Sequence, residues 1–255
     1  MRYIRPDSNN TFMSGFCFSI ITVCLDVVKS VRCTIESIQN QSFSDYEWIV
    51  VDGGSTDGTI DVLDDYSEHI ATLISEPDRG IYHAMNKGIA HAKGEYVIFM
   101  NAGDFFANKD VLAAVNAAPR ADLLIGDLIF SVSDKVRSLP DELPDNFLLT
   151  NMLPHQATFF RRQLFESHGH FDESFRIAGD YEMFARLIQS GEVSYRHVPK
   201  TIAVFQGGGI SESAEYRKIR KQENHRVRWK YFPAYRKSLK AIRQQVRNFL
   251  TKKAL

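Results

Sequence analysis

The sequence predicts an α/β protein in which helices cover both faces of a mostly parallel β-sheet. In the first half of the chain, short apolar runs typical of buried strands alternate with stretches whose apolar residues recur at helical spacing. Because a helix between two strands brings the second strand parallel to the first, this alternation favours a parallel sheet. Polar residues directly follow two of the runs, and ligands of such sheets bind beyond the carboxyl ends of the strands.

Strand and helix predictions follow one another in order along the first half of the chain. The expected strands are 18–23, 47–51, 71–75 and 95–100. Apolar residues at helical spacing predict helices at 28–38 and 80–93, each between two of these strands. After the second strand, Ser55 or Thr56 is expected to cap a further helix, because short hydroxyl side chains favour that position.

The second half is less regular, and fewer elements are expected in it. Strands are predicted at 122–126, 157–160 and 201–205. A helix is predicted at 180–189, with its apolar residues facing inward. Prolines interrupt a loop-rich connection between residues 140 and 154.

Length and composition limit the class of protein. With 255 residues, 44% apolar and 24% charged, the chain is expected to form one soluble globular domain of two lobes. Its three cysteines lack metal-ligand spacing, which predicts reduced thiols and a cytoplasmic protein. The apolar stretch 12–28 loosely resembles a signal peptide. A buried strand fits it better, because polar residues precede it and its densest part is too short to span a bilayer.

An acid and two glycines follow the second predicted strand, in the order Asp52-Gly53-Gly54. Glycines let a ligand approach the backbone, and a carboxylate can accept a hydrogen bond from a nucleotide base or a ribose hydroxyl. The spacing is not that of the dinucleotide-binding Gly-x-Gly-x-x-Gly motif. A turn followed by a helix cap is the alternative interpretation of these residues.

A second polar loop follows the fourth predicted strand, from Asn101 to Asp104. Oxygen ligands at the end of a strand suit Mg²⁺ or Mn²⁺, which bridge diphosphate oxygens and neutralise a departing nucleotide. An ordinary turn uses the same residue types, so taken alone this loop favours a turn.

Together, four blocks of the sequence resemble glycosyltransferase family 2. The blocks are 18–23, the segment around Asp52, 76–88 and 101–104. The resemblance covers about residues 16 to 210 and implies the GT-A fold, which is Rossmann-like. It also implies transfer of a sugar, with inversion, from a nucleotide-diphosphate sugar to a hydroxyl of an acceptor. Within the family, the chain is most similar to bacterial enzymes that build capsule or exopolysaccharide repeat units of the colanic-acid type.

The resemblance implies roles for residues on the donor side. Thr22 matches the position where the first strand contacts the nucleoside, and Asp52 matches the acid that binds the base, usually uracil. Arg79 and Lys87 are candidates for the diphosphate or the donor sugar, because cations complement phosphate oxygens. The alternative for Arg79 and Lys87 is a pair of solvated side chains on a helix.

The metal-binding block of the family is only partly present. Asp104 matches the last acid of the family's Asp-x-Asp-like motif and is the predicted ligand of Mn²⁺ or Mg²⁺. Asn101, another candidate for donor binding, and Gly103 stand where acids are frequent in the family. Because these two positions lack acids, the sequence predicts a metal site with a single carboxylate.

On the acceptor side, the resemblance implies that Asp180 is the general base. The reaction needs one group that takes the proton of the acceptor hydroxyl as this hydroxyl attacks the anomeric carbon. Helix capping is the competing role of Asp180, and the two roles are compatible. His155 and Gln156 resemble positions that face the acceptor, although a buried structural histidine is the alternative. Glu182 is expected to be a charge on the helix surface.

Two segments near the C-terminus suggest further roles. Residues 207–211 resemble a flexible loop that closes over donor and acceptor, with an inert turn as the alternative. Residues 216–255 carry 14 Lys and Arg against one acid, which gives +13, whereas the rest of the chain carries 17 against 30, which gives −13. Cations mixed with aromatic residues suit a helix on an anionic membrane leaflet. Helices packed on the acidic body or on a second subunit are the alternative.

These patterns predict an organisation and a function. The expected parts are an extension at 1–15, a GT-A domain at 16–210 and a basic helical tail at 211–255. Within the domain, 16–105 is the nucleotide-binding half and 106–210 the acceptor half. The predicted partners are a nucleotide-sugar donor and a glycan or lipid-linked sugar acceptor, on the inner face of the plasma membrane. A protein that binds membrane or, less expected, nucleic acid through the tail is one alternative, and a nucleotidyltransferase is another.

Overall fold

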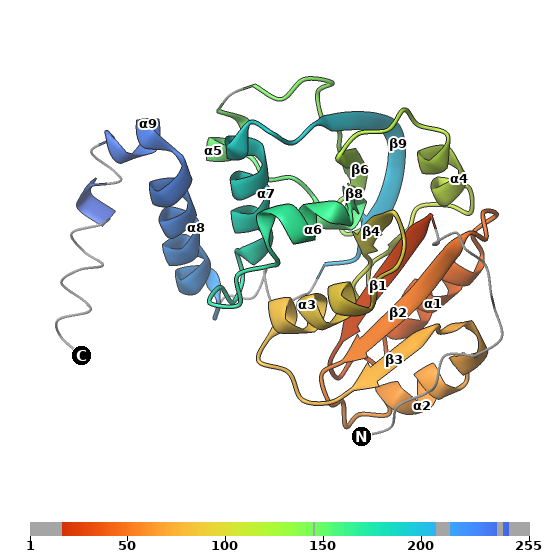
Figure 1. The fold of residues 1–255 in the computed structure, drawn as a ribbon. Helices are drawn as coiled ribbons and strands as arrows, with labels where there is room; N and C mark the ends of the chain where they lie inside the picture. Colours follow the sequence, from red (N-terminus) through yellow and green to blue (C-terminus); the bar gives the residue numbers. More distant parts are fainter. Residues whose placement is uncertain (1–16, 145, 208–214, 239–241, 245–255) are drawn as a thin grey trace. The chain divides into compact units, whose positions relative to one another are not determined.

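The computed structural model describes residues 17–144, 146–207, 215–238 and 242–244, which form two compact units (Figure 1). The first unit contains the described residues of Met1–Glu142, Pro154–His170 and Ser194–Gly207. The second contains those of Leu143–Leu153, Phe171–Val193 and Gly208–Leu255. The predicted extension at 1–15 lies outside the described residues, and the predicted division of the domain at residue 105 stays a prediction.

The first unit is built on a nine-stranded sheet in the order β3-β2-β1-β4-β8-β6-β9-β5, with β7 paired to β6. Its strands are β1 (Phe18–Cys24), β2 (Tyr46–Asp52), β3 (Thr72–Ser75), β4 (Tyr96–Phe99), β5 (Phe105–Phe106), β6 (Leu123–Phe130), β7 (Lys135–Arg137), β8 (Thr158–Arg161) and β9 (Tyr195–Phe205). From β3 to β4 the pairs are all parallel, and β6 and β9 are parallel as well. β8 lies between β4 and β6 and is antiparallel to both. β5 pairs antiparallel with β9, and β7 pairs antiparallel with β6.

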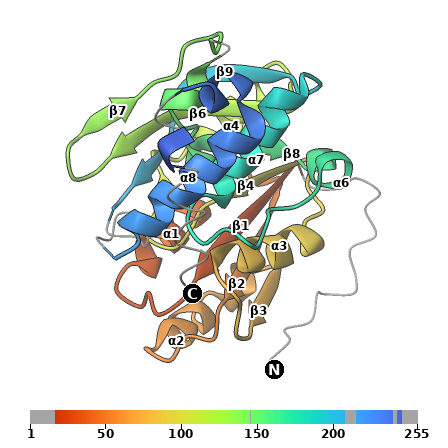
Figure 2. The same cartoon turned by 90° about the vertical axis from the view of Figure 1, so that its left-hand side faces the viewer.

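Helices cover both faces of the parallel part of this sheet, as predicted (Figures 1 and 2). The helices of this unit are α1 (Val31–Gln39), α2 (Thr59–Asp64), α3 (Ile81–His91), α4 (Val111–Asn116) and α6 (Gln163–His168), with short 3₁₀ turns at Ser67–His69 and His155–Ala157. On one face, Ile35 of α1 belongs to the same buried cluster as Ile20 of β1. On the other face, Gly88 of α3 lies so close to Ile21 that an added Cβ would be 2.5 Å from the Ile21 Cγ2 atom. Because neighbouring residues of a strand point to opposite faces, Ile20 and Ile21 mark the two covered surfaces.

The strand register brings the polar ends of three strands together. Cys24 at the end of β1 is opposite Asp52 at the end of β2, and Asp52 is opposite Ser75 at the end of β3. The carboxyl ends of these parallel strands therefore form one edge, where the fold class places its ligands.

The second unit is helical in its described part. It contains α5 (Phe147–Thr150), α7 (Gly179–Ser190), α8 (Arg217–Tyr231) and α9 (Pro233–Arg236). Glu223, His225 and Val227 of α8 are buried, and α8 packs against α7. The predicted tail therefore contains two helices in its described part, and most of the tail beyond residue 238 lies outside the described residues. None of the described helices has both the length and the apolar character needed to cross a membrane.

The predicted cap after β2 is wrong. The residue that precedes α2 is Gly58, with φ of +95°, a left-handed conformation that glycine adopts easily. The hydroxyl of Ser55 donates instead to Asp52, and the Asp57 carboxylate accepts the N–H of Thr59 at 3.0 Å. Asp57 thus accepts a backbone N–H at the start of α2, the role that was predicted for Ser55 or Thr56.

Candidate functional site

Asp52 lies at the expected edge of the sheet, but its carboxylate is closed to solvent. The residue is 0% exposed, and its Oδ2 accepts hydrogen bonds from the N–H of Gly54 at 3.0 Å and from the Ser75 hydroxyl at 2.8 Å. Its Oδ1 accepts from the Ser55 hydroxyl. Asp52 therefore shapes the turn after β2, and direct contact with a base needs a rearrangement of this turn.

A second acid, for which no role was predicted, lies at the same edge. The Oδ2 atom of Asp78 occupies the space beside Gly53, so that a Cβ added at Gly53 would lie only 2.5 Å from it. The other oxygen of Asp78 accepts the N–H of Gly80 at 2.8 Å. Asp78 is half-buried, whereas Asp52 is closed to solvent. The sequence signal was Gly53 itself, because a residue without a side chain allows this close approach.

Thr22 is a packing residue in this structure. It is 0% exposed, and its hydroxyl accepts a hydrogen bond from the Trp48 indole N–H at 3.0 Å. β1 continues for two residues beyond it, to Cys24. The side chain of Thr22 is therefore not accessible to a nucleoside in this conformation, and its predicted contact with the nucleoside stays a prediction.

The two cations proposed for the donor differ in their surroundings. The Lys87 ammonium lies 2.8 Å from the Glu76 carboxylate and 3.2 Å from the carbonyl oxygen of Pro77. The hydrogen bond from Lys87 to the Glu76 carboxylate, together with the positive charge of Lys87, lowers the pKa of Glu76. Arg79 is exposed, and its backbone N–H donates to Nδ1 of His83 at 3.2 Å. Lys87 thus anchors the segment before α3, and Arg79 lies at the surface beside it.

The loop from Asn101 to Asp104 is held in place by α1. The Thr34 hydroxyl donates to the carbonyl oxygen of Asp104 at 2.6 Å and accepts the N–H of Gly103 at 2.9 Å. Gly103 has φ of +105°, so glycine suits this turn for a conformational reason. The Asp104 carboxylate, 6% exposed, accepts the N–H of Gln206 at 3.2 Å. The predicted closing loop starts just after Gln206, but its residues 208–211 lie outside the described residues.

Two residues predicted for opposite sides of the reaction meet here. The Asn101 Nδ2 atom is 3.2 Å from Nε2 of His155, so donor-side and acceptor-side candidates are in contact. The Asn101 Oδ1 atom is buried and has no hydrogen-bond partner among the described residues. Gln156, the next residue, is 7% exposed.

The oxygens of this loop fit a hard divalent cation. The described part of the chain contains no cluster of three or more His, Cys, Asp or Glu side chains suited to a metal. Mg²⁺ and Mn²⁺ nevertheless bind sites in which one or two carboxylates act together with substrate phosphates and water. The Asp104 carboxylate and the unsatisfied Asn101 Oδ1 provide such a partial set, because an unpaired buried oxygen is costly unless something binds it.

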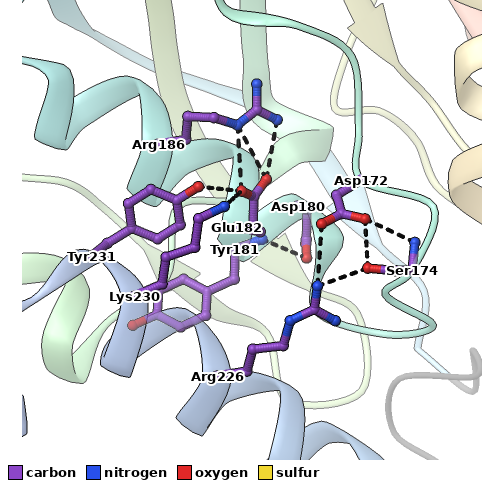
Figure 3. Close-up of polar contacts among 9 residues, drawn as sticks. All are labelled: Asp172, Ser174, Asp180, Tyr181, Glu182, Arg186, Arg226, Lys230 and Tyr231. Carbon is purple, nitrogen blue, oxygen red and sulfur yellow. Dashed lines mark hydrogen bonds and ion pairs between the residues drawn. The ribbon is translucent and has the colours of Figure 1, made fainter.

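The predicted base belongs to the second unit. Asp180 is the second residue of α7 and is 7% exposed, and its Oδ1 accepts the N–H of Tyr181 at 2.8 Å. Glu182, expected on the helix surface, is 1% exposed, so that expectation is wrong. Its carboxylate binds Arg186 at 3.0 Å, Lys230 at 3.3 Å and the Tyr231 hydroxyl (Figure 3). The last two partners come from α8, which sequence spacing cannot reveal.

Several of the residues described so far lie at the carboxyl ends of the parallel strands, where α/β proteins bind ligands, and comparison with known proteins identifies the family. The profile described as "Glycosyl transferase family 2" matches residues 19–184. A PGL/p-HBAD biosynthesis glycosyltransferase of Mycobacterium tuberculosis is 30% identical over 209 residues, which are 79% of this chain and 81% of the relative. The chain therefore belongs to glycosyltransferase family 2 and is a glycosyltransferase.

Solved structures show the same fold. Residues 1–349 of S. aureus TarS superpose with a TM-score of 0.61 at 20% identity, covering 82% of this chain and 63% of that TarS chain. The chain thus spans somewhat less than two thirds of TarS 1–349, and it covers 43% of the longer TarS chain. The mannosyltransferase PcManGT from Pyrobaculum calidifontis superposes with a TM-score of 0.65 at 22% identity, covering 86% of this chain and 64% of the other. Both support the GT-A fold.

Proposed function

We propose that this glycosyltransferase moves a sugar, with inversion, from a nucleotide-diphosphate sugar to a hydroxyl of a glycan or lipid-linked acceptor in bacterial surface polysaccharide synthesis. The observation that carries the proposal is the Asn101–Asp104 loop, where an unsatisfied buried oxygen lies three residues before a carboxylate. The TarS structure contains UDP, and the mannosyltransferase structure contains GDP-Man and Mn²⁺. A uridine nucleotide is our preferred donor.

Asp104 and Asn101 would hold the divalent cation, Mn²⁺ or Mg²⁺, together with oxygens of the donor diphosphate. When bound, the cation would supply the positive charge that stabilises the departing nucleoside diphosphate. His155 orients Asn101: when the amide Nδ2 donates to the ring, the amide oxygen remains available as a ligand. The role of His155 is thus to position a donor-site residue, in addition to its predicted place on the acceptor side.

The nucleoside is proposed to bind at the carboxyl ends of β1, β2 and β3. Asp52 fixes the turn there, and Asp78 offers the more accessible carboxylate for the N–H of a base. Arg79, exposed in the same segment, is the proposed contact for the diphosphate, because a guanidinium pairs well with phosphate oxygens.

Asp180 is the proposed general base. As the acceptor hydroxyl attacks the anomeric carbon, its proton passes to the Asp180 carboxylate, and the bond from that carbon to the diphosphate oxygen breaks on the opposite side. One oxygen of Asp180 accepts the N–H of Tyr181, which orients the carboxylate. This single displacement inverts the configuration of the transferred sugar.

The test is release of nucleoside diphosphate from UDP- and GDP-sugars with Mn²⁺ and alkyl glycosides as acceptors. We expect the wild type to release UDP, and Asp180→Asn to lose transfer by a factor of about 100 or more while it still binds the donor. Glu166→Gln, a change in an exposed ion pair, is the matched control and should remain active. Release of pyrophosphate from nucleoside triphosphates, without turnover of any nucleotide sugar, would identify a nucleotidyltransferase instead.

For location, we propose that the exposed face of α8 binds an anionic membrane leaflet and brings the enzyme to a lipid-linked acceptor. Arg217, Lys218 and Lys221 are exposed on this helix. Each Lys or Arg near such a surface contributes about 1 kcal/mol to binding. Flotation with phosphatidylserine vesicles should fall sharply when all three are changed to alanine, and should be absent with phosphatidylcholine alone. Unchanged flotation of the triple variant, or salt-sensitive binding to oligonucleotides only, contradicts this proposal.

A further inference from the structure

Helix α8 contacts the segment that carries Asp180 through several side chains. We call Glu223, Arg226, Lys230 and Tyr231 the α8 clamp. Their spacing of three, four and one residues places them on neighbouring positions of one helix face. Val227 lies within the same face and is 0% exposed, so the centre of this face is packed.

Glu223 holds the backbone directly before α7. Its Oε1 accepts the N–H of Arg176 at 2.8 Å, and its Oε2 accepts the N–H groups of Ile177 and Ala178, both at 2.9 Å. Glu223 is 8% exposed, and hydrogen bonds to a buried charged group are stronger than neutral ones. A negative charge at this place also complements the N-terminus of α7, which begins at Gly179. Three consecutive amides are thereby fixed immediately before the predicted base.

The other clamp residues hold the chain on both sides of Asp180 (Figure 3). Before it, Arg226 donates to the Ser174 hydroxyl at 2.8 Å and lies 3.4 Å from the Asp172 carboxylate. After it, Lys230 and Tyr231 bind Glu182. Arg228 of α8 also donates to the Tyr181 hydroxyl at 3.3 Å. The segment from 172 to 182 is therefore attached to α8 both before and after Asp180.

From these contacts we infer that Glu223 is a positioning residue for the transfer reaction, acting through Asp180. The inference rests on the proposed function, in which Asp180 is the base. A carboxylate base must lie within hydrogen-bond reach of the acceptor hydroxyl, and a displacement of about 1 Å can cost a factor of about 100 in rate. By fixing the amides of 176–178, Glu223 fixes where α7 starts and hence where its second residue points. The beginning of the predicted basic tail is thus part of the catalytic apparatus.

The test uses the full-length chain with the changes Glu223→Gln and Glu223→Ala. We expect kcat to fall by a factor of about 10 to 100 in Glu223→Ala, with less loss in Glu223→Gln, whose amide oxygen still accepts hydrogen bonds. KM for the donor and the Mn²⁺-dependent stabilisation by UDP should stay at wild-type values. Glu166→Ala, which removes a carboxylate from an exposed ion pair, is the control and should retain wild-type kcat.

A double variant separates positioning from general damage. If Glu223 acts through Asp180, adding Glu223→Gln to Asp180→Asn should slow the enzyme further by less than a factor of about two, because residues that act as a unit are not additive. Multiplication of the two losses, or full activity of folded Glu223→Gln and Glu223→Ala beside an inactive Asp180→Asn, would overturn the inference and leave the proposed base intact. Full activity of Asp180→Asn would overturn both.

Discussion

Replacing Glu182 with alanine is expected to destabilise the second unit by about 2–3 kcal/mol. The carboxylate is 1% exposed and binds Arg186, Lys230 and the Tyr231 hydroxyl. Removing one member of a buried ion pair typically costs about 3–5 kcal/mol, because the partner charge stays buried and unpaired. Here the side chains of Lys230 and Arg186 are 57% and 20% exposed, so both regain water and the expected loss is smaller.

Urea unfolding followed by circular dichroism measures this loss. With a slope of about 2 kcal/mol per molar urea, the midpoint should fall by about 1–1.5 M for Glu182→Ala. Glu166→Ala is the matched control, because Glu166 pairs with Arg162 at 2.7 Å at the same four-residue spacing but with side chains 62% and 41% exposed. That control should change stability by less than about 0.5 kcal/mol. Equal shifts for the two variants would refute the argument that burial makes Glu182 important.

Three further predictions follow. Burial and, second, the Asp52 charge raise the pKa of Cys24, so its thiolate is scarce and a thiol reagent should modify it at mildly alkaline pH only after unfolding in urea. Gly94→Ala should cost about 1–3 kcal/mol in urea unfolding, because the new Cβ would lie 2.5 Å from the backbone nitrogen of Ser19. Burial alone would raise the pKa of Asp122, but the hydrogen bonds from Ser194 outweigh it and lower this pKa. Its stabilisation is therefore present above the unfolded-state pKa and is lost as pH falls through the folded-state value, so urea midpoints of wild type and Asp122→Asn should converge in acid.

The parallel half of the fold could be predicted because its signals are local. Each of the first four strands is a short apolar run, and the structure confirms all four within one or two residues at each end. The short edge strands β5 and β7 have two and three residues, too few for a periodic pattern, and neither was predicted. β9 was predicted only from 201, although it begins at Tyr195, because its first residues are mostly polar and partly exposed.

The places of the candidate residues in the fold could be predicted from the sequence, but their contacts could not. Sequence order places Asp52 at a strand end, yet only the folded turn shows that its oxygens are already occupied. Glu182 follows Asp180 on a helix whose apolar pattern suggested an outer position, and its partners Lys230 and Tyr231 are 48 and 49 residues away. Contacts between residues so far apart in the sequence depend on tertiary packing, and no local sequence pattern encodes them.

Calorimetric titration of UDP into the protein, with and without Mn²⁺, tests the central claim most directly. We expect the wild type to bind UDP only when the metal is present, and Asp104→Ala to lose this metal-dependent binding. At 100 times its dissociation constant, UDP with Mn²⁺ should also stabilise the wild-type fold by about 2.7 kcal/mol. Equal binding with and without Mn²⁺, or full metal-dependent binding by Asp104→Ala, would contradict the assignment of the Asn101–Asp104 loop as the metal and diphosphate site.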